Sequence, residues 1–205
     1  WDPTWHTVSV SVVAGFVGVV VVVPVALLVG RYRSRWSGPV LAAVTAGFAL
    51  PGLVVALSVV FVALRVPGLF GLYQTLPLLV FAYVVHFGAQ AFRTAEVGVA
   101  AVDPRLDEVA RTLGAGPVRR FFRIDLPAMA PVLAAGGGLV MLSTMKELPA
   151  TLLAAPSGFD TLATRVWNAT SDGFLADAAL ASLLLLALSA LMTWWLVIRR
   201  AEHLG

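Results

Sequence analysis

Long runs of apolar residues with almost no charged side chains constrain this chain more than any other feature. Residues 8–29 form one such run, which contains no charge at all. A stretch of about 20 apolar residues fits a helix that crosses a bilayer, where the backbone must satisfy its own hydrogen bonds. The sequence therefore predicts an all-α membrane protein with about five transmembrane helices. The expected spans are 8–29, 38–64, 76–92, 127–145 and 174–198.

Composition agrees with a membrane protein. Only 12% of the 205 residues are charged, whereas soluble domains carry about 25%. With no cysteine, the chain has no disulfide framework, thiol nucleophile or Cys-ligated metal. The chain begins at Trp1 without a basic segment before the first run. We therefore expect this run to be a membrane helix rather than a signal peptide, and the chain to be a fragment of something longer.

Proline and glycine interrupt the expected spans at two places. Pro51–Gly52 lies near the middle of the second span and predicts a kinked helix. The triple glycine 136–138 allows a neighbouring backbone to approach closely. Both places are candidate hinges, with packing against neighbours as the alternative. Beyond the fourth span, Asp160 is expected to cap a short helix over residues 161–169.

Arginines gather between the apolar runs and predict the membrane topology. Thirteen of the 14 basic residues are arginine, and the clusters belong on the cytoplasmic side. Five spans then place the N-terminus outside and the C-terminus in the cytoplasm. This distribution is a topology signal, and we expect no nucleic-acid partner. The clusters are Arg31, Arg33 and Arg35; Arg93, Arg105, Arg111, Arg119, Arg120 and Arg123; and Arg199 and Arg200.

The arginine-rich loop, residues 93–126, is the longest polar stretch of the chain. Asp103–Pro104 predicts the start of a helix, and Gly114 predicts its end. Pro117 predicts the start of a second short helix, so the loop reads as a helix-turn-helix. In the first helix, Leu106, Val109, Ala110 and Leu113 form one apolar stripe. In the second, Val118, Phe121 and Phe122 share a face opposite Arg119, Arg120 and Arg123.

Two interpretations of this loop follow from its residues. It is either a helical hairpin on the lipid headgroups, with arginines meeting anionic lipid, or a docking element for another protein. Acidic residues weigh against simple lipid binding because they repel anionic headgroups. They are Glu96, Asp103, Asp107, Glu108 and Asp125.

The spacing within the loop resembles a known motif. Glu108-Val-Ala110, then Gly114, then Ile124-x-Leu126-Pro127 resembles the EAA signature of permease subunits of binding-protein-dependent type I ABC importers. One position departs, because Val109 stands where the family has its first alanine. In that family the loop is cytoplasmic, precedes the last two membrane helices and docks into the ATP-binding subunit. The resemblance implies a set of residues that contact the ATP-binding subunit. They are Glu108, Ala110, Gly114, Gly116, Pro117, Arg119, Arg120, Ile124, Leu126 and Pro127.

A second stretch narrows the resemblance. Met145-Lys146-Glu147-Leu-Pro149-Ala-Thr151-Leu, followed by residues 158–167, is similar to the ferric-iron branch of these permeases, which are usually fused duplicates. The chain would then be a single transmembrane domain, most of a C-terminal half without its first helix. Iron(III) is the first substrate expected; thiamine, phosphonate, sulfate or molybdate, and polyamine importers have related permeases.

The same resemblance implies the partners and the location. These are a dimer of ATP-binding subunits, a second permease half, a periplasmic or lipid-anchored substrate-binding protein and the lipid of a bacterial inner membrane. ATP and Mg²⁺ would bind the partner, since this chain has no GxxxxGK[ST] loop. We expect no cofactor, no metal ligand and no catalytic residue here. A non-transporting membrane scaffold and a membrane-embedded enzyme are the other classes considered; no clustered catalytic motif supports the enzyme.

Four residues are candidates for a translocation path or gate. Lys146 and Glu147, followed by Pro149, end the fourth span, and ionisable residues inside a membrane often mark a substrate path. The alternative is an interfacial position, with Lys146 reaching toward water and Glu147 pairing with it or with Arg165. His86 is a lone imidazole in the third span, where a hydrogen bond between helices is the alternative to a pathway role.

Overall fold

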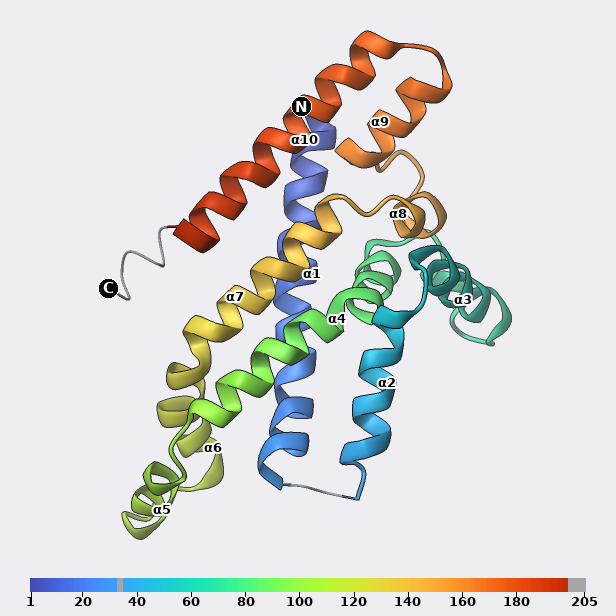
Figure 1. Cartoon of the computed structure of the whole chain (residues 1–205). Helices are drawn as coiled ribbons and strands as arrows, with labels where there is room; N and C mark the ends of the chain where they lie inside the picture. The colour runs from blue at the N-terminus through green and yellow to red at the C-terminus, as the bar shows by residue number, and fades with distance from the viewer. Residues whose placement is uncertain (33–34, 199–205) are drawn as a thin grey trace.

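Three long helices form the centre of the molecule (Figure 1). The computed structural model describes residues 1–32 and 35–198. The central helices are α1 (Asp2–Leu27), α4 (Leu76–Ala101) and α7 (Leu126–Met145). At 26 residues, α1 and α4 are each about 39 Å long and can cross a hydrocarbon core of about 30 Å. The largest side chains buried between these elements include Leu79, Tyr83, Phe92, Met129 and Val140.

Glycines let the central helices touch. A Cβ atom placed on Gly15 of α1 would lie 2.6 Å from the carbonyl oxygen of Gly137 on α7, so the two backbones are in contact. On either side of Gly137, Gly136 faces Thr94 of α4 and Gly138 faces Leu196 beyond α10. Each residue of the triple glycine therefore meets a different neighbour, and α7 stays helical through it. The structure supports packing as the reason for these glycines.

The expected second span is broken rather than kinked. Helices α2 (Ser37–Ala49) and α3 (Gly52–Arg65) meet at 114°. Leu50 and Pro51 between them are extended, because a proline ring disfavours helical backbone in the residue before it. With 13 and 14 residues, each helix is only about 20 Å long. The expectation of one kinked helix is wrong. Within the described residues, four helices are long enough to cross a membrane, or five spans if this pair counts as one.

The last part of the chain contains α8 (Pro149–Ala154), α9 (Leu162–Ser171) and α10 (Leu175–Thr193), which a π-helical segment, Trp194–Ile198, extends. The cap of α9 is Thr161 rather than the expected Asp160. The Thr161 hydroxyl accepts from the Thr164 backbone, and the Thr164 hydroxyl accepts from Thr161 in return. This reciprocal pair of hydrogen bonds is a capping box. Of the arginines used for topology, Arg33, Arg199 and Arg200 lie outside the described residues.

The arginine-rich loop lies at one end of the molecule, away from α8 and α9 (Figure 1). It contains α5 (Pro104–Thr112), α6 (Pro117–Arg120) and a π-helical segment, Phe121–Asp125. The second helix was expected to be separate from the fourth span. Instead, residues Pro117–Met145 form one continuous helical stretch, because the π-helical segment joins α6 to α7 without a turn. α6 and α7 are therefore parts of the same helical stretch.

Candidate functional sites

Both ends of α5 have the geometry that the sequence predicts. The Asp103 carboxylate accepts the Arg105 backbone N–H at 2.9 Å, which caps the start of the helix. At the other end Gly114 has φ +76°, a left-handed conformation that suits glycine. The Ala115 N–H donates to the Ala110 carbonyl and the Gly114 N–H to the Arg111 carbonyl, both at 2.9 Å. These two bonds form a Schellman motif, so α5 has a fixed length and exit direction.

The loop exposes a row of apolar side chains. Of the predicted stripe on α5, Leu106, Val109 and Leu113 are 50%, 55% and 81% exposed, whereas Ala110 is buried. In the following segment Val118 and Phe122 are also exposed, while Phe121 packs against the core. An apolar surface on a polar connecting loop is typical of an interaction site. The loop is therefore a candidate docking surface.

The residues of the EAA-like motif divide between this surface and the interior. Glu108, Gly114, Gly116, Pro117, Arg119 and Pro127 are exposed; Arg120, Ile124 and Leu126 are partly buried; Ala110 is buried. Although exposed, Glu108 also lines a cavity of about 710 Å³ between α5 and the ends of α1 and α4, together with Arg31 and Arg111. Some residues of the motif thus lie on the exposed surface of the loop, and others face the membrane helices.

A second candidate site, which we call the polar cluster, comprises Tyr83, His86, Glu147 and Thr151. The Tyr83 hydroxyl lies 2.6 Å from Thr151 Oγ1, and Thr151 Oγ1 donates to the Glu147 carbonyl at 2.7 Å. The Glu147 carboxylate accepts the Ala150 N–H at 3.2 Å. These bonds join α4 to the start of α8. Tyr83 is fully buried, where an unmade hydroxyl bond would be costly.

His86 connects the polar cluster to the bend between α2 and α3. Its Nδ1 lies 3.2 Å from the Gly47 carbonyl; a carbonyl only accepts, so Nδ1 carries the hydrogen. A Cβ atom on Gly52 would lie 3.1 Å from His86 Nε2 and 3.1 Å from Glu147 Oε1. The imidazole and the carboxylate therefore flank one point above Gly52. The structure thus contains the helix-to-helix hydrogen bond that was one interpretation of His86.

The other candidate path residues lie around this cluster. Lys146 is exposed at the C-terminal cap of α7, and Pro149 begins α8. Arg165, which the sequence offered as a partner for Glu147, lies 3.6 Å from Asp177 instead. In the described part of the chain, no group of three or more His, Asp or Glu residues gathers as a metal site.

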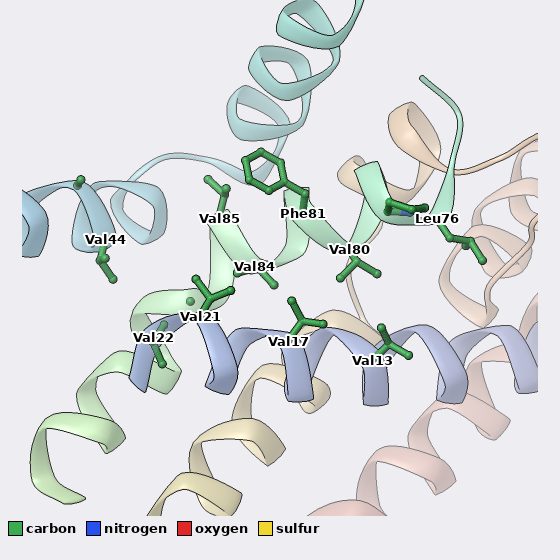
Figure 2. Close-up of a pocket in the computed structure, with 13 residues that line it drawn as sticks. Val13, Val17, Val21, Val22, Val44, Leu76, Val80, Phe81, Val84 and Val85 are labelled. Carbon is green, nitrogen blue, oxygen red and sulfur yellow. The ribbon is translucent and has the colours of Figure 1, made fainter. Parts of the chain in front are cut away.

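An apolar cavity of about 650 Å³ lies between α1, α2 and α4. Figure 2 shows Val13, Val17 and Val21 of α1 facing Val80 and Val84 of α4 across it. Every residue that lines this cavity is apolar, so it suits hydrocarbon rather than a hydrated ion. The polar cluster lies outside this cavity, at the bend between α2 and α3.

Sequence reasoning missed several residues of these sites. Tyr83 and Thr151 were part of an apolar run or of a resemblance, with no role of their own, and Gly52 was considered only as part of a kink or hinge. Arg31 was used only for topology and Asp125 only as an acidic residue of the loop, yet Arg31 Nη1 lies 2.7 Å from Asp125 Oδ1. Such pairs bring together residues from distant parts of the chain. Periodicity and motif spacing report local structure, so neither signal could have found them.

The bundle of membrane-length helices and the helical loop at its end define a multi-pass membrane protein of the transporter type. A family model described as "Binding-protein-dependent transport system inner membrane component" matches residues 22–199. The chain belongs to this family.

Similar proteins transport different substrates. The chain is 36% identical over 143 residues to the "Fe(3+)-transport system permease protein FbpB 2" of Haemophilus influenzae. This alignment covers 70% of the chain and 28% of that protein. It is 28% identical over 211 residues to the "Putative 2-aminoethylphosphonate transport system permease protein PhnV" of Salmonella typhimurium, over 100% of the chain and 76% of that protein. The chain thus spans less than a third of FbpB 2 and about three quarters of PhnV.

Solved structures share the fold. The MetNI methionine ABC transporter, in an inward-facing conformation, matches with a TM-score of 0.74 and 17% identity over 99% of this chain and 94% of the other. An amino acid ABC transporter matches with a TM-score of 0.61 and 20% identity, over 97% and 92%. The fold is that of the transmembrane domain of type I ABC importers.

Proposed function

We propose that this chain is a permease domain that forms a translocation path with a second permease half and takes its driving force from separate ATP-binding subunits. The observation that carries the proposal is the exposed apolar stripe on α5, where Leu113 is 81% exposed. The chain belongs to a family of transport components. Its exposed stripe lies on α5, a helix of fixed length. ATP and Mg²⁺ belong to the partner subunits in this proposal, and a substrate-binding protein delivers the cargo.

The loop residues have distinct roles in the proposed contact. Gly114 sets the direction in which the chain leaves α5, while Leu106, Val109 and Leu113 supply apolar contact. Arg119 and Arg120 offer planar donors for carboxylates of the partner. The resemblance adds Glu108, Ala110, Gly116, Pro117, Ile124, Leu126 and Pro127 to the same contact. In this proposal the loop lies in the cytoplasm and the N-terminus outside, in a bacterial inner membrane; the distribution of arginines supports this orientation.

The polar cluster is the proposed path or gate. His86 and Glu147 meet at a helix break, and irregular backbone at membrane depth is tolerated where it is buried in protein or lines a cavity. Ionisable side chains at such a place often mark a substrate path. Lys146 and Pro149, next to Glu147 in sequence, complete the proposed gate.

Iron(III) is the proposed substrate, and the similarity to FbpB 2 at 36% identity supports it. A phosphonate is the second candidate because PhnV aligns with the whole chain. An uptake assay in proteoliposomes separates them. The complete permease, its ATP-binding subunits and the binding protein encoded beside them would be supplied with ferric citrate or with 2-aminoethylphosphonate. ATP-dependent uptake of iron alone supports the first choice, and uptake of phosphonate alone refutes it.

Co-purification tests the permease proposal itself. A tagged permease should retain its ATP-binding subunit in detergent, and Glu108→Lys should remove it by reversing a charge within the contact. Retention of the subunit by Glu108→Lys, together with normal uptake, would show that the docking assignment is wrong.

A further inference from the structure

An ion pair joins the end of the first helix to the last segment of the arginine-rich loop. Arg31 Nη1 donates to Asp125 Oδ1 at 2.7 Å across 94 positions of sequence. The two side chains are 24% and 9% exposed. A charge-assisted hydrogen bond of this length is among the stronger polar contacts in proteins, and partial burial limits its screening by salt.

Both partners lie in π-helical segments. Arg31 belongs to Leu28–Tyr32, which continues α1, and Asp125 ends Phe121–Asp125, which joins α6 to α7. Such segments are rare and often accompany functional positions. The ion pair therefore connects two irregular points, one on each helix, at the level where the membrane helices meet the loop.

Open space flanks the ion pair on two sides. Arg31 lines the cavity of about 710 Å³ beside Glu108 and Arg111. It also lines a second cavity of about 290 Å³, together with Pro117 and Asp125. Close packing of side chains normally transmits strain between elements, and cavities interrupt it. The ion pair is thus a direct connection between the loop and α1 in a region that is loosely filled.

Helices α1 and α7 have another attachment deeper in the bundle. The backbones touch at Gly15 and Gly137, and Gly15 lies about 24 Å along the helix from Arg31. Gly18 against Val140, and Val19 against Gly137, extend this packing along the two helices. The ion pair adds an attachment beyond it, where α1 ends beside the loop.

We propose that the Arg31–Asp125 ion pair is a positioning element that carries movement of the arginine-rich loop into α1. When the loop shifts, α7 moves with its second helix because Pro117–Met145 is one continuous helical stretch, and the ion pair makes the end of α1 follow. Neither residue contacts substrate or nucleotide in this proposal. The inference rests on the proposed function, since it needs an ATP-driven movement of the loop.

Proteoliposomes with the full permease, its ATP-binding subunits and its binding protein test the proposal. Asp125→Asn and Arg31→Gln each remove one charge of the pair. We expect ATPase co-purification and ATP hydrolysis to stay within about twofold of the unsubstituted protein, while uptake per ATP hydrolysed falls about tenfold, a typical size for coupling between sites. The charge-reversed double variant Arg31→Asp/Asp125→Arg should recover at least half of the lost ratio, which a packing role would not predict.

The matched control is the Arg165–Asp177 pair at the other end of the molecule. Its side chains are 3.6 Å apart and about half exposed, and exposed ion pairs contribute little. Arg165→Gln and Asp177→Asn make the same charge changes and should leave the ratio of uptake to hydrolysis unchanged.

Each other outcome has a definite meaning. A normal ratio in Asp125→Asn and Arg31→Gln overturns the positioning role, while the proposed function stands if the ATP-binding subunit is retained. Failure of the double variant to recover the ratio also overturns it. If these variants no longer assemble with the ATP-binding subunit, the pair serves folding or docking, and the inference is wrong. If the unsubstituted permease binds no ATP-binding subunit, the proposed function itself fails.

Discussion

The arginine-rich loop and the polar cluster are two polar regions of an apolar chain, and their side chains are arranged in opposite ways. In the loop, Leu113 and Val118 are 81% and 69% exposed. Apolar side chains are not needed to connect two helices through water. The polar cluster instead buries Tyr83 and Thr151 and joins them through a hydrogen bond. One region exposes apolar side chains; the other joins polar groups by hydrogen bonds within the chain.

This difference indicates that the loop is suited to binding a partner, and the polar cluster to holding the helices of the chain. A surface that is incomplete in the free chain gains free energy when a partner covers it. A hydrogen-bonded cluster at a helix break can hold one arrangement of helices until movement elsewhere in the protein changes it. We therefore expect substitutions on the exposed surface of the loop to change partner binding, and substitutions in the polar cluster to change transport while binding persists.

Gly114→Asp should have the largest effect, a loss of uptake of about 100-fold or more. Left-handed backbone costs a non-glycine residue roughly 1–2 kcal/mol, and the new side chain redirects the exit from α5 and adds charge to the docking surface. Uptake and ATPase co-purification measure the change. Gly173→Asp is the control, because Gly173 also has a positive φ and open surroundings but lies beyond α9. Equal losses in both variants would mean that backbone strain, rather than docking, is responsible.

Glu147→Gln should lower uptake about tenfold and leave ATPase co-purification intact. The amide keeps an oxygen for the Ala150 N–H but removes the charge beside His86, and a single charge interaction in a partly buried site accounts for a change of this size. Asp177→Asn is the same change at an exposed carboxylate and should transport normally. If Glu147→Gln no longer retained the ATP-binding subunit, the loop and the polar cluster would not differ in their effect on partner binding.

Leu113→Gln should weaken binding of the ATP-binding subunit about fivefold. It removes an apolar contact at the interface, while an exposed position contributes little to folding. The dissociation constant in detergent measures this effect. Leu72→Gln changes another exposed leucine, in the turn Phe70–Leu72, and should bind normally. An unchanged constant for Leu113→Gln would move the contact away from α5.

Tyr83→Phe should have the smallest effect, a decrease of about 1 kcal/mol in the free energy of unfolding. It deletes one side of the 2.6 Å contact with Thr151, while Thr151 keeps its bond to the Glu147 carbonyl, so only one hydrogen bond is lost. Thermal unfolding in detergent reports the change. Tyr73→Phe is the matched control in the connector before α4 and should unfold as the unsubstituted chain does. A shift in Tyr73→Phe as large as that in Tyr83→Phe would argue against a special role for the cluster.

Local signals in the sequence predicted the loop well. Asp103, Pro104 and Gly114 each act on residues within one helical turn, and the structure confirms the start and end of α5. Length and hydropathy likewise identified four helices of membrane length, but not the break in the second expected span. These features depend on neighbours in sequence, which periodicity and capping rules describe directly.

Features that depend on tertiary contacts were not predictable in the same way. A proline such as Pro51 can kink a helix or break it, and the 114° bend follows from how α2 and α3 pack on α4 and α8. The meeting of His86 and Glu147 above Gly52 and the Arg31–Asp125 ion pair join residues from distant parts of the chain. A single sequence carries no pattern for such pairs.

Labelling of single cysteines tests the central claim, that the loop is a docking surface, most directly. The chain has no cysteine of its own, so Leu113→Cys and Phe174→Cys each introduce one exposed site, at 81% and 64% for the original side chains. With the permease in detergent, we predict that adding the ATP-binding subunit slows maleimide labelling of Leu113→Cys at least about tenfold and leaves Phe174→Cys unchanged, because a docked interface excludes water from its centre. Equal labelling of Leu113→Cys with and without a bound ATP-binding subunit would contradict the account.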